Sequence, residues 1–122
     1  MKNLNAIRLL TLGVAVIMLL MMPLSAMLMW TAQDEALGKE VYAKRCQMCH
    51  GPDGKADTKA GQMTKTPDMT TGEWNHGTSQ EDVEKLVREG AGKMKGFDGK
   101  LSDEEIAAVA YYTRKMCGLT EE

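Results

Sequence analysis

The five residues from Cys46 to His50, Cys-Gln-Met-Cys-His, place two thiols three positions apart, with an imidazole directly behind the second thiol. Three kinds of chemistry use a cysteine pair at this spacing: thiol–disulfide exchange, half of a zinc site, and covalent attachment of haem. Each of them demands a different fold and different residues elsewhere in the chain. The rest of the sequence therefore decides among the three.

A zinc site built on Cys46 and Cys49 needs two further ligands at a matching spacing. The only other cysteine is Cys117, and the only histidine besides His50 is His76, so no second ligand pair exists. A thioredoxin-like site needs its cysteine pair between a strand and a helix of a βαβ unit. Here the pair comes at the end of a predicted helix, and no parallel-sheet pattern is present. Both interpretations are therefore disfavoured.

Covalent attachment of haem uses all three side chains of the motif. The two thiols add across the vinyl groups of the porphyrin, and the adjacent histidine reaches the iron from one face. The chain from residue 34 onward has a single phenylalanine and few long apolar runs. A domain with so small a core is only marginally stable without an additional stabilising group. A large, flat apolar ring would extend the core and supply that stability. The motif therefore predicts one covalently bound haem c.

Residues 1–33 form a different kind of segment, in which the only charges are Lys2 and Arg8. Residues 9–30 are apolar and long enough as a helix to cross a hydrocarbon core of about 30 Å. Basic residues ahead of such a stretch keep the N-terminus in the cytoplasm. A signal peptide cleaved near Ala26 is the alternative, but cleavage would leave an exposed apolar end. We therefore predict a membrane anchor, and both interpretations export the remaining chain to the periplasm.

The remaining chain, residues 34–122, is predicted to be one acidic domain. It holds all 17 acidic residues and 13 of the 15 basic ones, because only Lys2 and Arg8 precede it, so its formal net charge is −4 (13 minus 17). Nucleic-acid binding calls for a basic surface. This composition therefore predicts no nucleic-acid partner.

Three amphipathic helices are predicted in this domain, at residues 34–46, 79–90 and 101–116. Ser79 is expected to cap the second helix and Ser102 the third, where a glutamate three residues on completes a capping box. The intervening residues 51–72 and 90–100 are rich in glycine and polar residues, which predicts irregular loops. No strand pattern is convincing, so the predicted fold class is all-α, with the hydrophobic N-terminal helix ahead of it.

Together these motifs resemble a known family, the class I (monohaem) c-type cytochromes, over essentially all of residues 36–117. The similar features are a glycine–aromatic pair, the attachment motif with its turn, a Pro-x-Leu-like segment, a tryptophan segment, a methionine loop and an aromatic last helix. In chain order they are Gly38 with Tyr42, CQMCHGPDGK at 46–55, TPDM at 66–69, GEWNHG at 72–77, GKMKGF at 92–97, and Tyr111 with Tyr112. The resemblance implies the class I cytochrome c fold, in which three or more helices wrap around one haem and the first helix packs against the last.

The resemblance also implies a role for individual residues in holding the haem. Cys46 and Cys49 would form the thioether bonds, and His50 would be one axial ligand of the iron. The carbonyl of Pro67 would accept a hydrogen bond from that histidine, and Trp74 would approach a haem propionate. A plain turn role for Pro67 and a plain core role for Trp74 are the alternatives.

The second axial ligand is sought among the five methionines of the domain. One lies between the two cysteines, two follow His50 closely, and one belongs to the apolar stripe of the last helix; these are Met48, Met63, Met69 and Met116. Met94 lies in a glycine-rich loop between two helices, and such a loop can wrap the far face of the ring. We therefore predict Met94 as the second iron ligand, with His76 as its rival.

Ligation by histidine and methionine fills both axial positions and raises the reduction potential. We therefore expect single-electron transfer in a respiratory chain, without enzyme activity and without a small-molecule substrate. The expected partners are redox proteins, in particular membrane oxidoreductases, met on the periplasmic side of a bacterial inner membrane. The alternative is a fixed haem c subunit of a larger membrane respiratory or reductase complex.

The sequence departs from the family in the methionine loop, where Lys95 follows Met94 in place of the usual proline. Proline restricts the backbone φ angle, so we expect a looser loop in which Lys93 or Lys95 displaces the methionine at high pH. Cys117 is expected to be a spectator, and pairing with another chain is the alternative.

Overall fold

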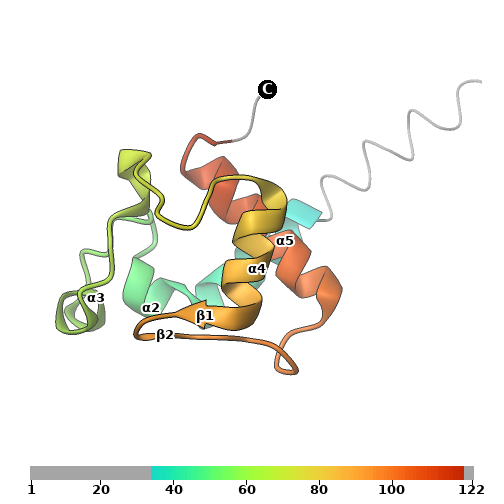
Figure 1. The fold of residues 1–122 in the computed structure, drawn as a ribbon, viewed down its shortest axis with the longest axis horizontal. Coiled ribbons are helices and arrows are strands. Elements are labelled where there is room, and N and C mark those ends of the chain that lie inside the picture. The colour runs from blue at the N-terminus through green and yellow to red at the C-terminus, as the bar shows by residue number, and fades with distance from the viewer. Residues whose placement is uncertain (1–33, 120–122) are drawn as a thin grey trace, which may run out of the picture. The chain divides into compact units, whose positions relative to one another are not determined.

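The structure is a computed structural model, and it describes residues 34–119 (Figure 1). The predicted membrane anchor at 1–33 and the alternative cleavage site near Ala26 lie outside the described residues. Within the described part, no helix combines the length and the apolar character that crossing a membrane requires.

The described chain is mostly helical, as the sequence predicts. After a helix at residues 34–45, the elements are α2 (Gln47–His50), α3 (Lys59–Thr64), the 3-10 helix η1 (Met69–Thr71), α4 (Gln80–Glu89), β1 (Gly90–Ala91), β2 (Met94–Lys95) and α5 (Asp103–Met116). Helices α4 and α5 pack together, and α2 and α3 pack together on the other side of the domain in Figure 1.

The two long helices α4 and α5 begin where their capping residues predict. Ser79 accepts a hydrogen bond from the backbone N–H of Asp82, and Ser102 accepts one from the backbone N–H of Glu105. In each case the acidic side chain accepts a bond from the N–H of its serine in return, which completes a capping box. Gly90, with a φ of 77°, ends α4. These predicted helix ends are confirmed.

Two segments predicted as irregular loops contain regular structure, so that part of the prediction was wrong. Within residues 51–72, Thr58 caps α3 and Asp68 caps η1, each by accepting a hydrogen bond from a backbone N–H in the first turn. Within residues 90–100, β1 and β2 pair as a short antiparallel hairpin. These elements are two to six residues long, too short to leave a periodic apolar pattern in the sequence.

The core lies where the helix at 34–45 crosses α5 and where α4 packs against α5. Gly38 is buried at the crossing, where a Cβ atom would overlap the carbonyl oxygen of Ala108 and lie 2.7 Å from the Cβ of Tyr112. The rings of Tyr42 and Tyr112 pack with their centroids 5.5 Å apart. The packing of the glycine–aromatic pair against the last helix, implied by the resemblance, is confirmed.

The buried cluster is small and its edge reaches the cysteine motif. Its members are Val41, Tyr42, Val83, Val87, Ile106, Val109 and Ala110. Partly buried residues around it are Leu37, Cys46, Met69, Trp74, Phe97, Leu101, Tyr112 and Met116. Because one thiol of the motif belongs to this edge, the candidate site adjoins the core.

Candidate functional site

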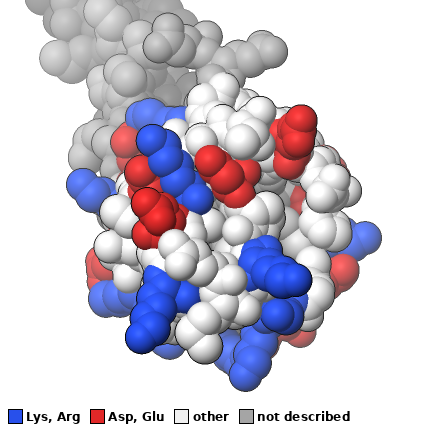
Figure 2. All heavy atoms as spheres, turned by 90° about the vertical axis from the view of Figure 1, so that its left-hand side faces the viewer, with Lys and Arg blue, Asp and Glu red and all other residues white. Residues whose placement is uncertain are grey.

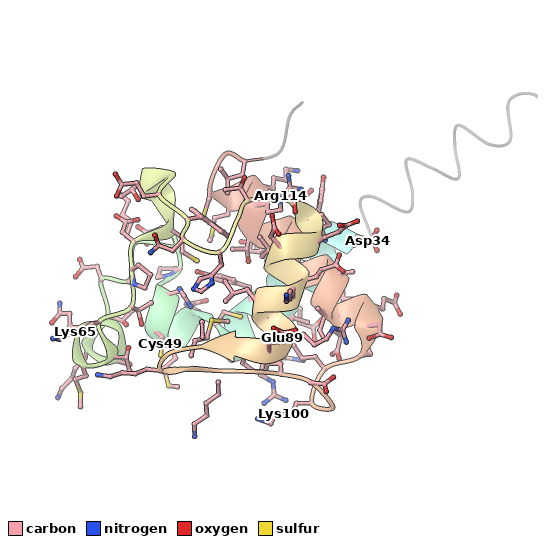
Figure 3. The ribbon with its side chains drawn as sticks, in the orientation of Figure 1. Asp34, Cys49, Lys65, Glu89, Lys100 and Arg114 are labelled. Carbon is pink, nitrogen blue, oxygen red and sulfur yellow. The ribbon has the colours of Figure 1, made fainter. Side chains whose placement is uncertain are left out.

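The cysteine motif lies on and just before the short helix α2. Cys46 is the N-cap residue of this helix, and Cys49, which is labelled in Figure 3, and His50 are its last two residues. Residues three apart on a helix are neighbours on its surface, so the two thiols project to the same side. Both are half-buried and form no disulfide. They are therefore free to bond to a group held beside α2.

The surroundings of this cysteine pair disfavour thiol–disulfide exchange and give no support to zinc. Burial, and to a smaller extent the charge of Cys49, raise the pKa of the Cys46 thiol to about 11. Exchange requires the thiolate, which is scarce at neutral pH in such a group. Among residues 34–119, no group of three or more His, Cys, Asp or Glu side chains is placed to hold a metal ion.

His50 ends α2 with its ring half-buried. Its Nδ1 atom is buried and has no hydrogen-bond partner among the described residues. Burial lowers the pKa of His50, which keeps the imidazole neutral, and the neutral form is the one that binds metal ions. A neutral, unpartnered imidazole directly behind two free thiols fits the donor set that covalent haem requires.

Pro67 is exposed, and no hydrogen bond joins its carbonyl to His50 in this structure. Two residues after Pro67, the backbone is joined to the turn at Gly54, because the N–H of Met69 donates to the carbonyl of Gly54 at 2.9 Å. The role of Pro67 as an acceptor for the histidine stays a prediction.

Trp74 is half-buried against the core, and its indole N–H donates to the carbonyl of Met69 at 2.8 Å. A bond to a haem propionate would have to share or replace this contact. The structure thus agrees with a packing role for Trp74, and the propionate contact stays a prediction.

Met94, the predicted second ligand, lies half-buried in β2. It pairs with Ala91 across a two-residue turn, and Gly90 pairs with Lys95. A Cβ atom on Gly90 would overlap the carbonyl oxygen of Met94, and the φ of Gly90 is positive, so this hairpin requires glycine there. The hairpin directly follows Glu89, labelled in Figure 3, and extends toward the side of the domain that carries α2.

The base of this hairpin is fixed to the last turn of α4. The N–H of Phe97 donates to the carbonyl of Val87 at 3.0 Å, and the N–H of Asp98 donates to the carbonyl of Arg88 at 3.1 Å. The guanidinium of Arg88 also pairs with Asp103, in the first turn of α5, at 2.8 Å. The methionine loop is therefore held at both ends. The displacement of Met94 from the iron by a neighbouring lysine at high pH stays a prediction.

The rival ligands lie in different surroundings. Met48 and Met63 are 74% and 73% exposed, and His76 is exposed in a turn. Met116 packs at the edge of the core. A ligand that shields an iron from water must itself be withdrawn from solvent, which disfavours the exposed candidates. Met69 and Met116 are half-buried as Met94 is, so the assignment of Met94 stays a prediction.

Comparison with known proteins identifies the family. The family described as cytochrome c oxidase, cbb3-type, subunit III, matches residues 33–112. The chain belongs to the class I c-type cytochromes. It is accordingly an electron-transport protein that carries one covalently attached haem c.

Three relatives show how far the similarity extends. The solved structure of the KustC0563 c-type cytochrome is 30% identical, with a TM-score of 0.57, and the match covers 69% of this chain and 98% of that one. Cytochrome c6 of Euglena gracilis is 33% identical over 81 residues, covering 66% of this chain and 91% of the relative. The cbb3-type cytochrome c oxidase subunit FixP of Bradyrhizobium diazoefficiens is 29% identical over 86 residues, or 70% of this chain. The chain spans only 28% of the length of that subunit.

Cys117 is the thiol left over when the other two cysteines hold haem, and we expect it to react slowly. Burial, and secondly the charge of Asp68, raise its pKa to about 11. At pH 8 the thiolate is then on the order of 100-fold scarcer than in an ordinary cysteine. A thiolate of higher pKa is also more nucleophilic, so we expect alkylation by iodoacetamide to be slower by on the order of tenfold. Mass spectrometry of the holoprotein over time measures the rate. Fast alkylation would show that Cys117 is reactive. A dimer that dissociates only when a reductant is added would show that Cys117 forms a disulfide with another chain.

Proposed function

We propose that this chain transfers single electrons through one haem c bonded to Cys46 and Cys49, with His50 and Met94 as the axial ligands of its iron. The observation that carries the proposal is the environment of His50. Its imidazole is kept neutral by burial, has an unpartnered Nδ1, and follows directly on two free thiols.

Each of these four residues has a defined task. The thiols of Cys46 and Cys49 hold the porphyrin covalently on one side of α2. His50 and Met94 would be the two side chains that bind the iron, which would leave no position for a substrate, and a methionine ligand would raise the reduction potential. When bound, haem c carries one electron by alternating between iron(II) and iron(III). Neither axial residue needs to move or exchange a proton for this transfer.

We place the domain, residues 34–122, on the periplasmic side of a bacterial inner membrane, attached by an anchor at 1–33. Support comes from the haem-attachment motif, which is matured outside the bacterial cytoplasm, and from Lys2 and Arg8 ahead of the apolar stretch. A tether of this kind raises the effective concentration of the domain near membrane oxidoreductases. Cleavage near Ala26, which would release the domain into the periplasm, is the alternative.

The proposed partners are redox proteins, with no nucleic acid and no small-molecule substrate among them. Figure 2 shows the face of the domain that carries α3, on which Lys and Arg side chains and Asp and Glu side chains are both present, with several of the Lys and Arg side chains along its lower part. Lys59 and Lys65 of this region are exposed. Exposed charges of this kind orient a partner with a complementary pattern and speed its encounter.

A fixed haem subunit of a larger membrane respiratory or reductase complex is the second candidate. Support for it comes from the matching family and from FixP, both described as parts of a cbb3-type oxidase. The carrier is favoured by the similarity to cytochrome c6 over 91% of that protein's length.

Gentle solubilisation of membranes, followed by size-exclusion chromatography at a haem wavelength, separates the two candidates. We expect a haem-bearing particle near the monomer mass, whose intact mass equals the full chain plus one haem. A much larger haem-bearing particle with further subunits would favour the complex. A chain without haem would overturn the proposal of electron transfer altogether, and a mass that starts after Ala26 would replace the anchor by a signal peptide.

A further inference from the structure

His50, the proposed iron ligand, is the last residue of α2. This helix has four residues and follows the helix at 34–45 after a single turn residue, Cys46. The last carbonyl groups of a helix have no partner within it. The direction in which His50 leaves the backbone therefore depends on what other elements supply to these carbonyls.

Four consecutive carbonyl groups at this end accept hydrogen bonds from outside the helix. The hydroxyl of Thr58 donates to the carbonyl of Met48 at 2.8 Å and is 3.1 Å from that of Cys49. The N–H of Ala56 donates to the carbonyl of His50 at 2.8 Å. The last of the four, Gly51, accepts from the hydroxyl of Tyr42 at 2.8 Å. Two side-chain hydroxyls thus hold three of the four carbonyls.

Thr58 is itself fixed in place, because its hydroxyl oxygen accepts a hydrogen bond from the N–H of Gly61 at 2.8 Å and so caps α3. A Cβ atom on Gly61 would come within 2.5 Å of the carbonyl oxygens of Cys49 and Ala56. Glycine therefore lets α3 approach the end of α2 closely. One hydroxyl consequently joins the start of α3 to the end of the helix that carries the ligand.

Tyr42 reaches the same end of α2 from the opposite direction in the sequence. Its side chain belongs to the helix at 34–45, is 2% exposed, and packs against the ring of Tyr112. Burial raises the pKa of Tyr42 above its usual value, so the hydroxyl remains a donor over the whole working pH range. Phenylalanine could supply the same ring packing, but it could not hold the carbonyl of Gly51.

We propose that Tyr42 and Thr58 are positioning residues for the iron ligand His50, acting through the carbonyl groups of α2 and its C-cap. This inference rests on the proposed function, in which His50 binds the iron. The two hydroxyls donate to carbonyl groups of Met48, Cys49 and Gly51, and so hold the backbone from which the ring of His50 projects. This constraint acts on the backbone and is separate from any hydrogen bond to the ring's Nδ1, such as the one predicted with the carbonyl of Pro67.

The test removes each hydroxyl while keeping the shape of the side chain, in the variants Tyr42→Phe and Thr58→Val of the holoprotein. We expect each to shift the reduction potential and the electron paramagnetic resonance g values of the oxidised form, which report the orientation of the axial ligands. Tyr112→Phe is the matched control, since it removes a tyrosine hydroxyl from the same ring pair, and it should shift neither. Thr58→Ser, which retains the hydroxyl, should have the reduction potential and the g values of the parent protein.

The outcomes distinguish this inference from the function on which it rests. If Tyr42→Phe and Thr58→Val lower only the melting temperature, with the potential and g values of the parent protein, the hydroxyls are structural and the inference is overturned. If Thr58→Val does not fold, Tyr42→Phe decides, because it removes the other hydroxyl that holds this backbone. If the parent protein itself lacks a low-spin histidine–methionine spectrum, or keeps it in His50→Ala, the proposed ligation fails first.

Discussion

Replacing Met94 with alanine is expected to lower the reduction potential by on the order of 0.1 V, a fraction of the ~0.8 V range over which axial ligands set haem potentials. The substitution removes the thioether that raises the potential, and water or another side chain takes its place. The charge-transfer band between thioether and iron should disappear from the spectrum of the oxidised protein. Potentiometric titration with parallel absorbance spectra measures both effects.

Met63→Ala is the matched control for this variant, because Met63 lies on α3 with 73% of its surface exposed. It removes the same side chain and should leave the band and the potential unchanged. His76→Ala tests the rival ligand. Retention of the band in Met94→Ala would show that Met94 does not bind the iron, and a low-spin spectrum that collapses only in His76→Ala would transfer the role to the histidine.

The core of the candidate site could be predicted from the sequence because its chemistry fixes residue types and spacing. Two thiols three apart and a histidine behind them have one use that employs all three side chains, and the structure brings Cys46, Cys49 and His50 together on one short helix. The contacts of Trp74 could not be predicted in the same way. Its indole N–H bonds to a backbone carbonyl, and carbonyl positions depend on the local turn rather than on residue type.

The surroundings of Met94 show the same limit of sequence reasoning. The absence of a proline after Met94 predicts a loose loop, and this stays a prediction. The sequence does not show that the base of the hairpin is joined to α4 by backbone hydrogen bonds from Phe97 and Asp98. Every residue except proline can donate such a backbone hydrogen bond, so no pattern of side chains in the sequence predicts where they form. The one sequence signal was glycine: Gly90 is required because a side chain there would overlap the opposite strand.

The long helices could be predicted from the sequence, whereas the short ones could not. Helices α4 and α5 are long enough to show an apolar stripe and begin at serine caps, so both signals agreed. Helix α3 has six residues and η1 has three, and they are capped by Thr58 and Asp68. Caps of this kind also occur in ordinary turns, so without periodicity they do not identify a helix.

Replacing Gly38 with valine is expected to destabilise the holoprotein by about 3 kcal/mol, since overpacking a close contact typically costs 1–3 kcal/mol and occasionally more. A Cβ atom at this position would overlap the carbonyl oxygen of Ala108 and lie 2.7 Å from the Cβ of Tyr112. Both atoms belong to the packed surface of α5, so the helix at 34–45 must move away from it. Thermal unfolding followed by circular dichroism measures the effect, with a fall of about 4–8 °C for each kcal/mol in a domain of this size.

Ala43→Val is the matched control, because Ala43 lies on the same helix with its side chain in solvent. It introduces the same β-branched side chain into the same helix, and a surface change of this kind should stay within about 0.5 kcal/mol. The control therefore measures the effect of introducing valine at an exposed position of this helix. Because valine is a better helix former than glycine, helix propensity cannot explain a loss of stability in Gly38→Val. Equal melting temperatures would mean that the two helices do not touch at Gly38. A large difference would show that this glycine fixes the distance between the helix that carries Tyr42 and α5.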